Sequence, residues 1–285
     1  MHDFFIRFRL SLLAVISSIL LSGCSFSFVY NNLDWWVNWY LDDYVVLDKA
    51  QQEKFDNSFE RLHHWHRQTQ LIRYAEQLKL LKQQVNDGIS AEQLSEHLKG
   101  MNSHWVNVRE QAKPDLIELT YLLSSEQRTE LIESLEERNK EIIEEREERT
   151  REEWVKQECI SQQKEFREWV GKLTKTQKNT ICEMSGEFQS TFDYWIGYRK
   201  LWLQGFTESL DTNIDKSMYQ QLFAELIANP EKLRSDEYNQ VREKNNQAFA
   251  NIFHYMMNNL TQKQLKRFNK RLQNYIDDFI ELSED

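Results

Sequence analysis

One short pattern recurs five times along this chain, and it marks helix starts. An apolar residue is followed by Ser, Thr or Asp, two variable positions and Gln, as in Leu173-Thr174-Lys175-Thr176-Gln177. In such a capping box the Ser, Thr or Asp side chain accepts a bond from the amide three residues on, and the Gln side chain reaches back. The capping residues are Asp48, Ser90, Ser124, Thr174 and Thr261. Their uneven spacing excludes a solenoid of regular repeats.

Two prolines and seven glycines in 285 residues leave few helix breakers, so we predict an all-α fold of long antiparallel helices. The predicted helices are 33–45, 48–87, 90–122 with a kink or a restart at Pro114, 124–170, 174–210, 214–228, 236–258 and 261–282. No linker rich in Pro, Gly or Ser divides the chain. We therefore expect residues 24–285 to form one helical domain.

The segment 126–153 is dense in charge and poor in apolar residues. A helix of this composition is mostly solvated, so it is expected to protrude as one arm of a charged helical hairpin. A docking arm for a partner protein and a plain solvated face are both compatible with this pattern.

The N-terminus has the layout of a bacterial lipoprotein signal. Arg7 and Arg9 precede an apolar run over 10–21, which is too short for a spanning helix. Leu21-Ser22-Gly23-Cys24 then resembles a lipobox, which predicts removal of residues 1–23 and acylation of Cys24. Ser25 after the Cys favours sorting to the outer membrane, facing the periplasm. An ordinary signal peptide or a signal anchor is the alternative.

The remaining cysteines are Cys159 and Cys182. An exported chain meets an oxidising periplasm, where an even pair invites a disulfide. The midpoint between the two lies next to Gly171, a predicted helix stop, so antiparallel helices would bring them to the same height. Two free, buried thiols are the alternative.

The formal net charge of -10 argues against nucleic acid as a partner. The densest aromatic stretch supplies the candidate binding surface, formed by Trp35, Trp36, Trp39, Tyr40 and Tyr44. Core packing is the interpretation that the helical pattern favours. An aromatic belt at the lipid headgroups is the alternative, because Cys24 is close in the chain.

No catalytic or nucleotide-binding motif is present, so we expect no enzymatic activity and no cofactor. The histidines of Leu62-His63-His64-Trp65-His66 do not gather three ligands on one helix face. We therefore expect no metal site.

The N-terminal third resembles a family of uncharacterised proteobacterial lipoproteins with a domain of unknown function. The residues that carry the resemblance are the lipobox, Tyr30, Leu33-Asp34-Trp35, residues 39–44, Leu47-Asp48, Gln51 and His64-Trp65-His66-Arg67. It implies an outer-membrane or periplasmic lipoprotein without known activity. The boxes at 173–177 and 260–264 also resemble the motif of LTxxQ periplasmic chaperones of the Spy type, which are shorter and unlipidated.

The predicted function is a lipid-anchored, non-enzymatic lipoprotein that contacts the bilayer through acylated Cys24 and binds other envelope proteins. A periplasmic holdase that binds unfolded clients on an aromatic helical surface is the alternative. An envelope hydrolase is a third, residual possibility.

Overall fold

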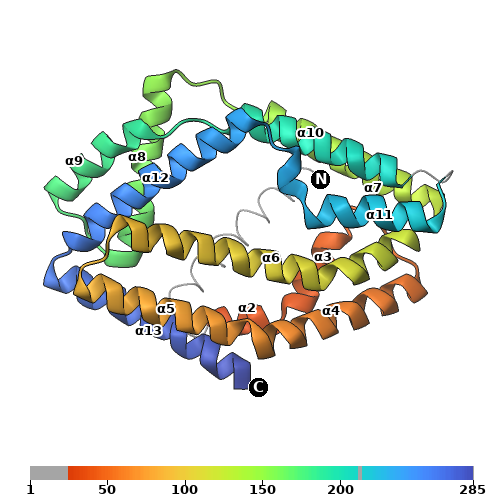
Figure 1. The fold of residues 1–285 in the computed structure, drawn as a ribbon, viewed down its shortest axis with the longest axis horizontal. Coiled ribbons are helices and arrows are strands. Elements are labelled where there is room, and N and C mark those ends of the chain that lie inside the picture. Colours follow the sequence, from red (N-terminus) through yellow and green to blue (C-terminus); the bar gives the residue numbers. More distant parts are fainter. Residues whose placement is uncertain (1–24, 211–213, 285) are drawn as a thin grey trace, which may run out of the picture.

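The computed structural model describes residues 25–210 and 214–284, which form helices and no β-strand (Figure 1). The predicted all-α fold is confirmed, whereas residues 1–23 and Cys24 lie outside the described residues. The helices are α2 (Ser25–Asn31), α3 (Leu33–Leu41), α4 (Lys49–Thr69), α5 (Leu71–Asp87), α6 (Ala91–Tyr121), α7 (Ser125–Glu144), α8 (Arg151–Val170), α9 (Lys175–Met184), α10 (Phe192–Ser209), α11 (Lys216–Ala228), α12 (Asp236–Asn258) and α13 (Gln262–Glu284), with 3-10 turns at Ser185–Glu187 and Pro230–Leu233.

All five predicted capping boxes form. At the start of α9, Thr174 Oγ1 accepts from the Gln177 amide at 3.1 Å, and Gln177 Oε1 accepts from the Thr174 amide at 2.9 Å. A sixth box, Thr150 with Glu153, starts α8. The pattern missed this box because Glu stands in place of Gln and because Arg149, not an apolar residue, precedes Thr150.

Four of the capping glutamines bond to one another in two pairs. Gln51 of α4 pairs with Gln127 of α7, each side-chain nitrogen donating to the other's oxygen at 2.8 and 2.7 Å. Gln177 of α9 pairs with Gln264 of α13 in the same way at 2.9 Å. Each nitrogen also donates to the carbonyl two residues before the partner's capping residue; these carbonyls belong to Leu122, Val46, Asn259 and Lys172. Each pair therefore joins helix starts that are 76 or 87 residues apart.

The helices pack around two large apolar clusters and one small one. The first lies among α5, α8, α9, α12 and α13, at the left in Figure 1, and includes Ile181, Ile252, Met256, Phe268 and Leu272. The second lies between α10 and α11 at the right, with α6 and α7 packed against it, and includes Leu203, Phe206, Tyr219 and Phe223. Burial of each such side chain contributes about 1.5–3 kcal/mol.

The predicted helix over 124–170 is wrong as one element. Helix α7 ends at Glu144 and α8 begins at Arg151. No apolar residue stands between Ile143 and Trp154, so no packing there carries the helix forward. Helix α7 packs along α10, whereas α8 and α9 form a hairpin.

The predicted helix over 174–210 is also divided. Helix α9 ends at Met184, a 3-10 turn follows, and α10 begins at Phe192. The turn directs Phe188 into the first apolar cluster, where it is buried. Burial of this ring therefore takes precedence over the helical tendency of the local sequence.

One further boundary differs from prediction. The helix expected over 48–87 is divided at Gln70, which ends α4 and precedes α5. Pro114 lies inside α6, which does not restart there and continues to Tyr121. In the described part of the chain, no helix combines the length and apolar character needed to cross a bilayer.

The glutamine pairs can be tested by a double-mutant cycle. Gln177→Ala should lower the free energy of unfolding by about 2–3 kcal/mol, because it removes a cap and leaves buried polar groups unpaired. Gln264→Ala should act similarly, and the double variant should lose at least about 1 kcal/mol less than the sum. Urea denaturation measures these values.

Gln93→Ala is the matched control, since Gln93 caps α6 without a glutamine partner. It should cost about 1 kcal/mol and add to Gln177→Ala without coupling. Additive losses for Gln177 and Gln264 would contradict the pairing.

Candidate interaction surface

Helix α3 and the turn after it carry the aromatic residues that the sequence singled out. The sequence of α3 is almost wholly apolar, yet it contains no buried residue. Trp35 is 57% exposed and Tyr40 is 59% exposed, while Trp36 and Tyr44 are half-buried. The interpretation of α3 as core packing is therefore wrong: α2 and α4 contact one side of this helix, but they bury none of its residues and leave Trp35, Trp39 and Tyr40 exposed.

These aromatic residues contact one another along the helix. Trp36 packs edge-on against Trp35 and Trp39, with ring centroids 4.7 and 6.3 Å apart. The hydroxyls of Tyr40 and Tyr44 are hydrogen-bonded at 2.9 Å. Burial, followed by this bond, raises the pKa of Tyr44 to about 12. The five residues therefore form two contacting groups, the three tryptophans and the two tyrosines, that are neighbours in the chain.

A groove runs between this surface and α7. It has a volume of about 480 Å³, and its lining includes Trp39, Tyr40, Tyr44, Glu137, Arg138 and Glu141. Arg138 Nη1 donates to Glu141 at 2.8 Å. Aromatic faces and carboxylates together favour cations, so the groove suits a segment that carries Lys or Arg side chains.

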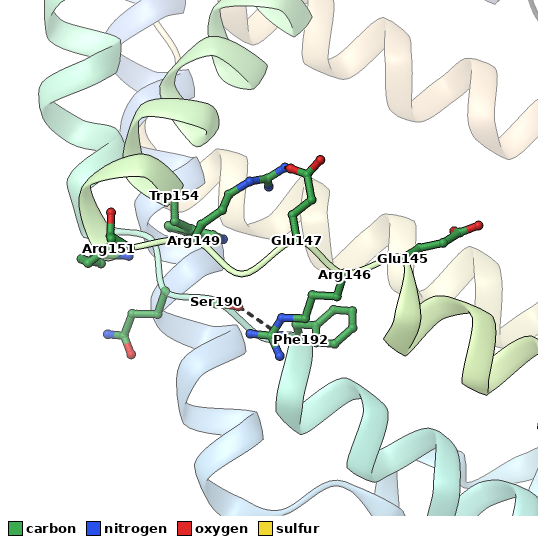
Figure 2. Close-up of a pocket in the computed structure, with 10 residues that line it drawn as sticks. Glu145, Arg146, Glu147, Arg149, Arg151, Trp154, Ser190 and Phe192 are labelled. Atoms are coloured by element: carbon green, nitrogen blue, oxygen red, sulfur yellow. Dashed lines mark hydrogen bonds and ion pairs between the residues drawn. The ribbon is translucent and has the colours of Figure 1, made fainter.

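A larger hollow of about 790 Å³ lies between the segment linking α7 to α8 and the start of α10 (Figure 2). Arg146 lies over the Phe192 ring at 4.3 Å and pairs with Asp193. Arg149 pairs with Glu147 at 2.7 Å, and Arg151 donates to the Gly186 carbonyl. Because these arginines already have partners and carboxylates surround them, the hollow does not form an anion site.

The histidine cluster fixes α2 to the body. The Tyr30 hydroxyl bonds His66 Nδ1 at 2.8 Å, and His66 Nε2 bonds the Tyr74 hydroxyl at 3.0 Å. Burial, and then the nearby His63, lower the pKa of His66 to about 4. Among the described residues no group of three or more His, Cys, Asp or Glu is placed to hold a metal ion. The sequence pattern identified the histidines but not their tyrosine partners on α2 and α5.

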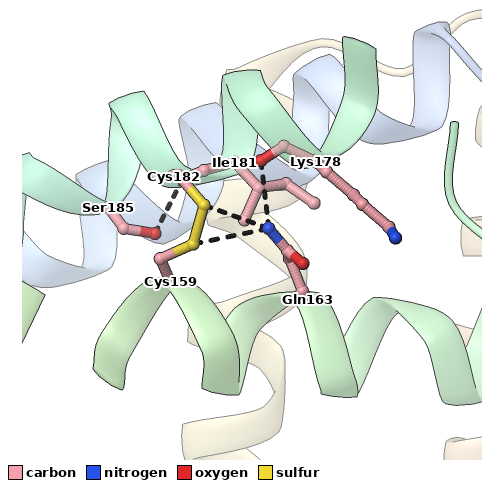
Figure 3. Close-up of a disulfide and its surroundings, with 6 residues drawn as sticks. All are labelled: Cys159, Gln163, Lys178, Ile181, Cys182 and Ser185. Carbon is pink, nitrogen blue, oxygen red and sulfur yellow. Dashed lines mark hydrogen bonds between the residues drawn. A yellow bond between two sulfur atoms is a disulfide. The ribbon is translucent and has the colours of Figure 1, made fainter. Parts of the chain in front are cut away.

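Cys159 on α8 and Cys182 on α9 are joined by a disulfide, with Cα atoms 4.6 Å apart (Figure 3). Helix α8 ends at Gly171, whose φ of 84° lies in the left-handed region that favours glycine. Gln163, which sequence reasoning missed, donates to Cys182 Sγ at 3.0 Å and to the Lys178 carbonyl at 3.1 Å. The disulfide and Gln163 thus connect the two helices at the same height.

The model of a family of unknown function, DUF6279, matches residues 43–239. The chain is thus an all-helical protein that belongs to this family. No curated protein and no solved structure matches it.

The state of His66 predicts a pH dependence of stability. His66 stays neutral in the folded protein down to pH about 4, whereas the unfolded chain takes up a proton near pH 6.5. The unfolded state therefore binds more protons in this window, and stability falls as the pH falls from 6.5 to 4.

The wild-type protein should lose about 2 kcal/mol more free energy of unfolding on acidification than the His66→Gln variant. This figure is smaller than the full pKa shift would give, because the ring is partly solvated and solvent screens the interaction. Chemical denaturation at pH 7 and pH 4.5 measures the difference. His64→Gln, at an exposed position of the same helix, is the matched control for the substitution itself. The same loss in the His66→Gln variant would contradict the assignment.

The disulfide predicts that periplasmically produced protein has no titratable thiol under denaturing, non-reducing conditions. Replacing both Cys159 and Cys182 with Ser should lower the free energy of unfolding by about 3 kcal/mol, because the bridge no longer restricts the unfolded chain. Two thiols per mature chain in the wild type would contradict the prediction.

Proposed function

We propose that this chain is a lipid-anchored envelope lipoprotein that binds other envelope proteins from the periplasmic face of the outer membrane and catalyses no reaction. The lipobox and Ser25 support the anchor and the location. The absence of catalytic motifs from the sequence supports a binding role.

The groove between α3 and α7 is the observation that carries the binding role. One wall is aromatic and exposed, and the other carries Glu137 and Glu141 beside Arg138. Exposed aromatic side chains are typical of residues that contribute most to protein interfaces. The partner is a protein segment that places basic side chains in the groove and packs apolar groups on Tyr40.

The anchor predicts the mass of the protein extracted from membranes. Residues 1–23 should be missing and lipid mass should be present on Cys24. A Cys24→Ala variant should keep its signal peptide, because the acylated thiol is required for processing. Normal processing and acylation of that variant would contradict the proposal.

The groove can be tested by a photo-cross-linking residue at Tyr40 in intact cells. A small set of discrete protein adducts is expected on irradiation, because a specific partner occupies the groove. Glu137→Lys together with Glu141→Lys should abolish the adducts through charge repulsion. The same probe at Ile160, exposed on α8, is the control and should give none.

Identical adducts from both positions, or none from Tyr40, would contradict the binding role. A continuous smear of many adducts would instead favour the holdase. That alternative is supported by the exposure of Trp35 and Tyr40, since a chaperone needs accessible apolar surface for its clients. A holdase should also suppress aggregation of a denatured model protein near a one-to-one ratio.

A further inference from the structure

Helices α2 and α3 form a nearly uncharged surface. Residues 25–41 carry a single charged side chain, Asp34, and no Lys or Arg occurs between Cys24 and Lys49. Phe28 is 60% exposed, on α2, and Trp35 is 57% exposed, on α3. This surface lacks the basic residues that bind anionic lipid, but it has the aromatic rings typical of a lipid headgroup region.

The rings of α3 include a tryptophan cluster, which we define as the exposed Trp35 and Trp39 and the half-buried Trp36 between them. The rings touch edge to face, so they form one surface and not three separate contacts. An indole ring combines a large apolar face with one N–H donor. This combination suits the boundary between acyl chains and water better than either phase alone.

The chain places this cluster close to the predicted acyl anchor. Trp35 lies eleven positions after Cys24. A helical path of that length covers at most about 17 Å, and the headgroup layer on each side of a bilayer is about 5–8 Å thick. An acylated Cys24 therefore keeps the tryptophan cluster near the lipid surface.

The helices cannot swing freely between the anchor and the body. Tyr30 is bonded to His66 and buried to 5% exposure, and the guanidinium of Arg67 lies over its ring. Phe26 packs edge-on against Phe279 of α13 at 5.2 Å. These contacts fix α2 on α4, α5 and α13, so a contact between α3 and lipid also orients the rest of the protein.

We propose that α2 and α3 lie in the headgroup layer of a zwitterionic lipid surface, with Phe28 and the tryptophan cluster inserted. The acyl chains and this helix pair then contact the membrane at two places and hold the body in one orientation. This inference rests on the proposed function, because it requires acylation of Cys24.

The test uses the full lipidated protein in vesicles of phosphatidylethanolamine and phosphatidylcholine that contain brominated phosphatidylcholine. Bromine quenches tryptophan only on contact with the acyl region. About a third of the wild-type emission should be lost, since three of the nine tryptophans contact lipid. The variant Trp35→Phe, Trp36→Phe, Trp39→Phe should lose almost all of this quenching.

The matched control replaces Trp154, Trp195 and Trp202, which lie on α8 and α10, with Phe. Its quenched fraction should rise, because non-contacting emitters are removed. Intact mass of each reconstituted protein reports acylation separately. Absence of lipid mass overturns the proposed function together with this inference.

Lipid mass without quenching overturns this inference alone. Equal quenching in the wild type and in the variant that replaces Trp35, Trp36 and Trp39 also overturns this inference alone. A photo-cross-linker at Trp35 should label lipid. Protein adducts in its place would overturn the lipid assignment and give this surface to a protein partner.

Discussion

The reciprocal bonds between capping glutamines hold distant parts of this chain together. The side-chain oxygen of each glutamine accepts a bond at the start of its own helix. Its side-chain nitrogen donates one hydrogen to the partner glutamine and the other to a backbone carbonyl just before the partner's helix, so both amide hydrogens are used. Gln177 and Gln264 do so while almost fully buried. In that environment an unmade hydrogen bond costs about 1–3 kcal/mol, so the two helix starts must keep their relative position.

The candidate surface depends on the other pair. Val46 lies between α3 and α4, and its carbonyl accepts a bond from Gln127 in the first turn of α7. The walls of the groove, α3 and α7, are therefore tied together at one end by the pair of Gln51 and Gln127. Helix α3 stays in place although it has no buried residue of its own, because the segment that follows it is fixed.

Local chemistry made the helix starts predictable from the sequence, because a capping box needs only four consecutive residues. The breaks near Arg146 and Phe188 were not predictable in this way. In the first, a stretch without apolar residues is held by contacts of Arg146 with Phe192 and Asp193, and the second depends on burial of a ring among helices distant in the chain.

The aromatic residues of the candidate surface were identified by composition alone. Their exposure was not predictable, because an apolar helix face has the same sequence pattern whether or not another helix covers it. Likewise, the sequence did not predict that Glu137 and Glu141 of α7 line a groove with α3, because only the fold brings these two helices together.

The contacts of α13 determine which residues a stable fragment of this protein must include. The family match ends at residue 239, whereas α13 spans Gln262–Glu284 and packs along α5 and α8. A fragment trimmed to the matched region would lose Gln264 and expose the first apolar cluster, so it would be prone to aggregate. The folded unit therefore extends beyond the residues that match the family and includes α13.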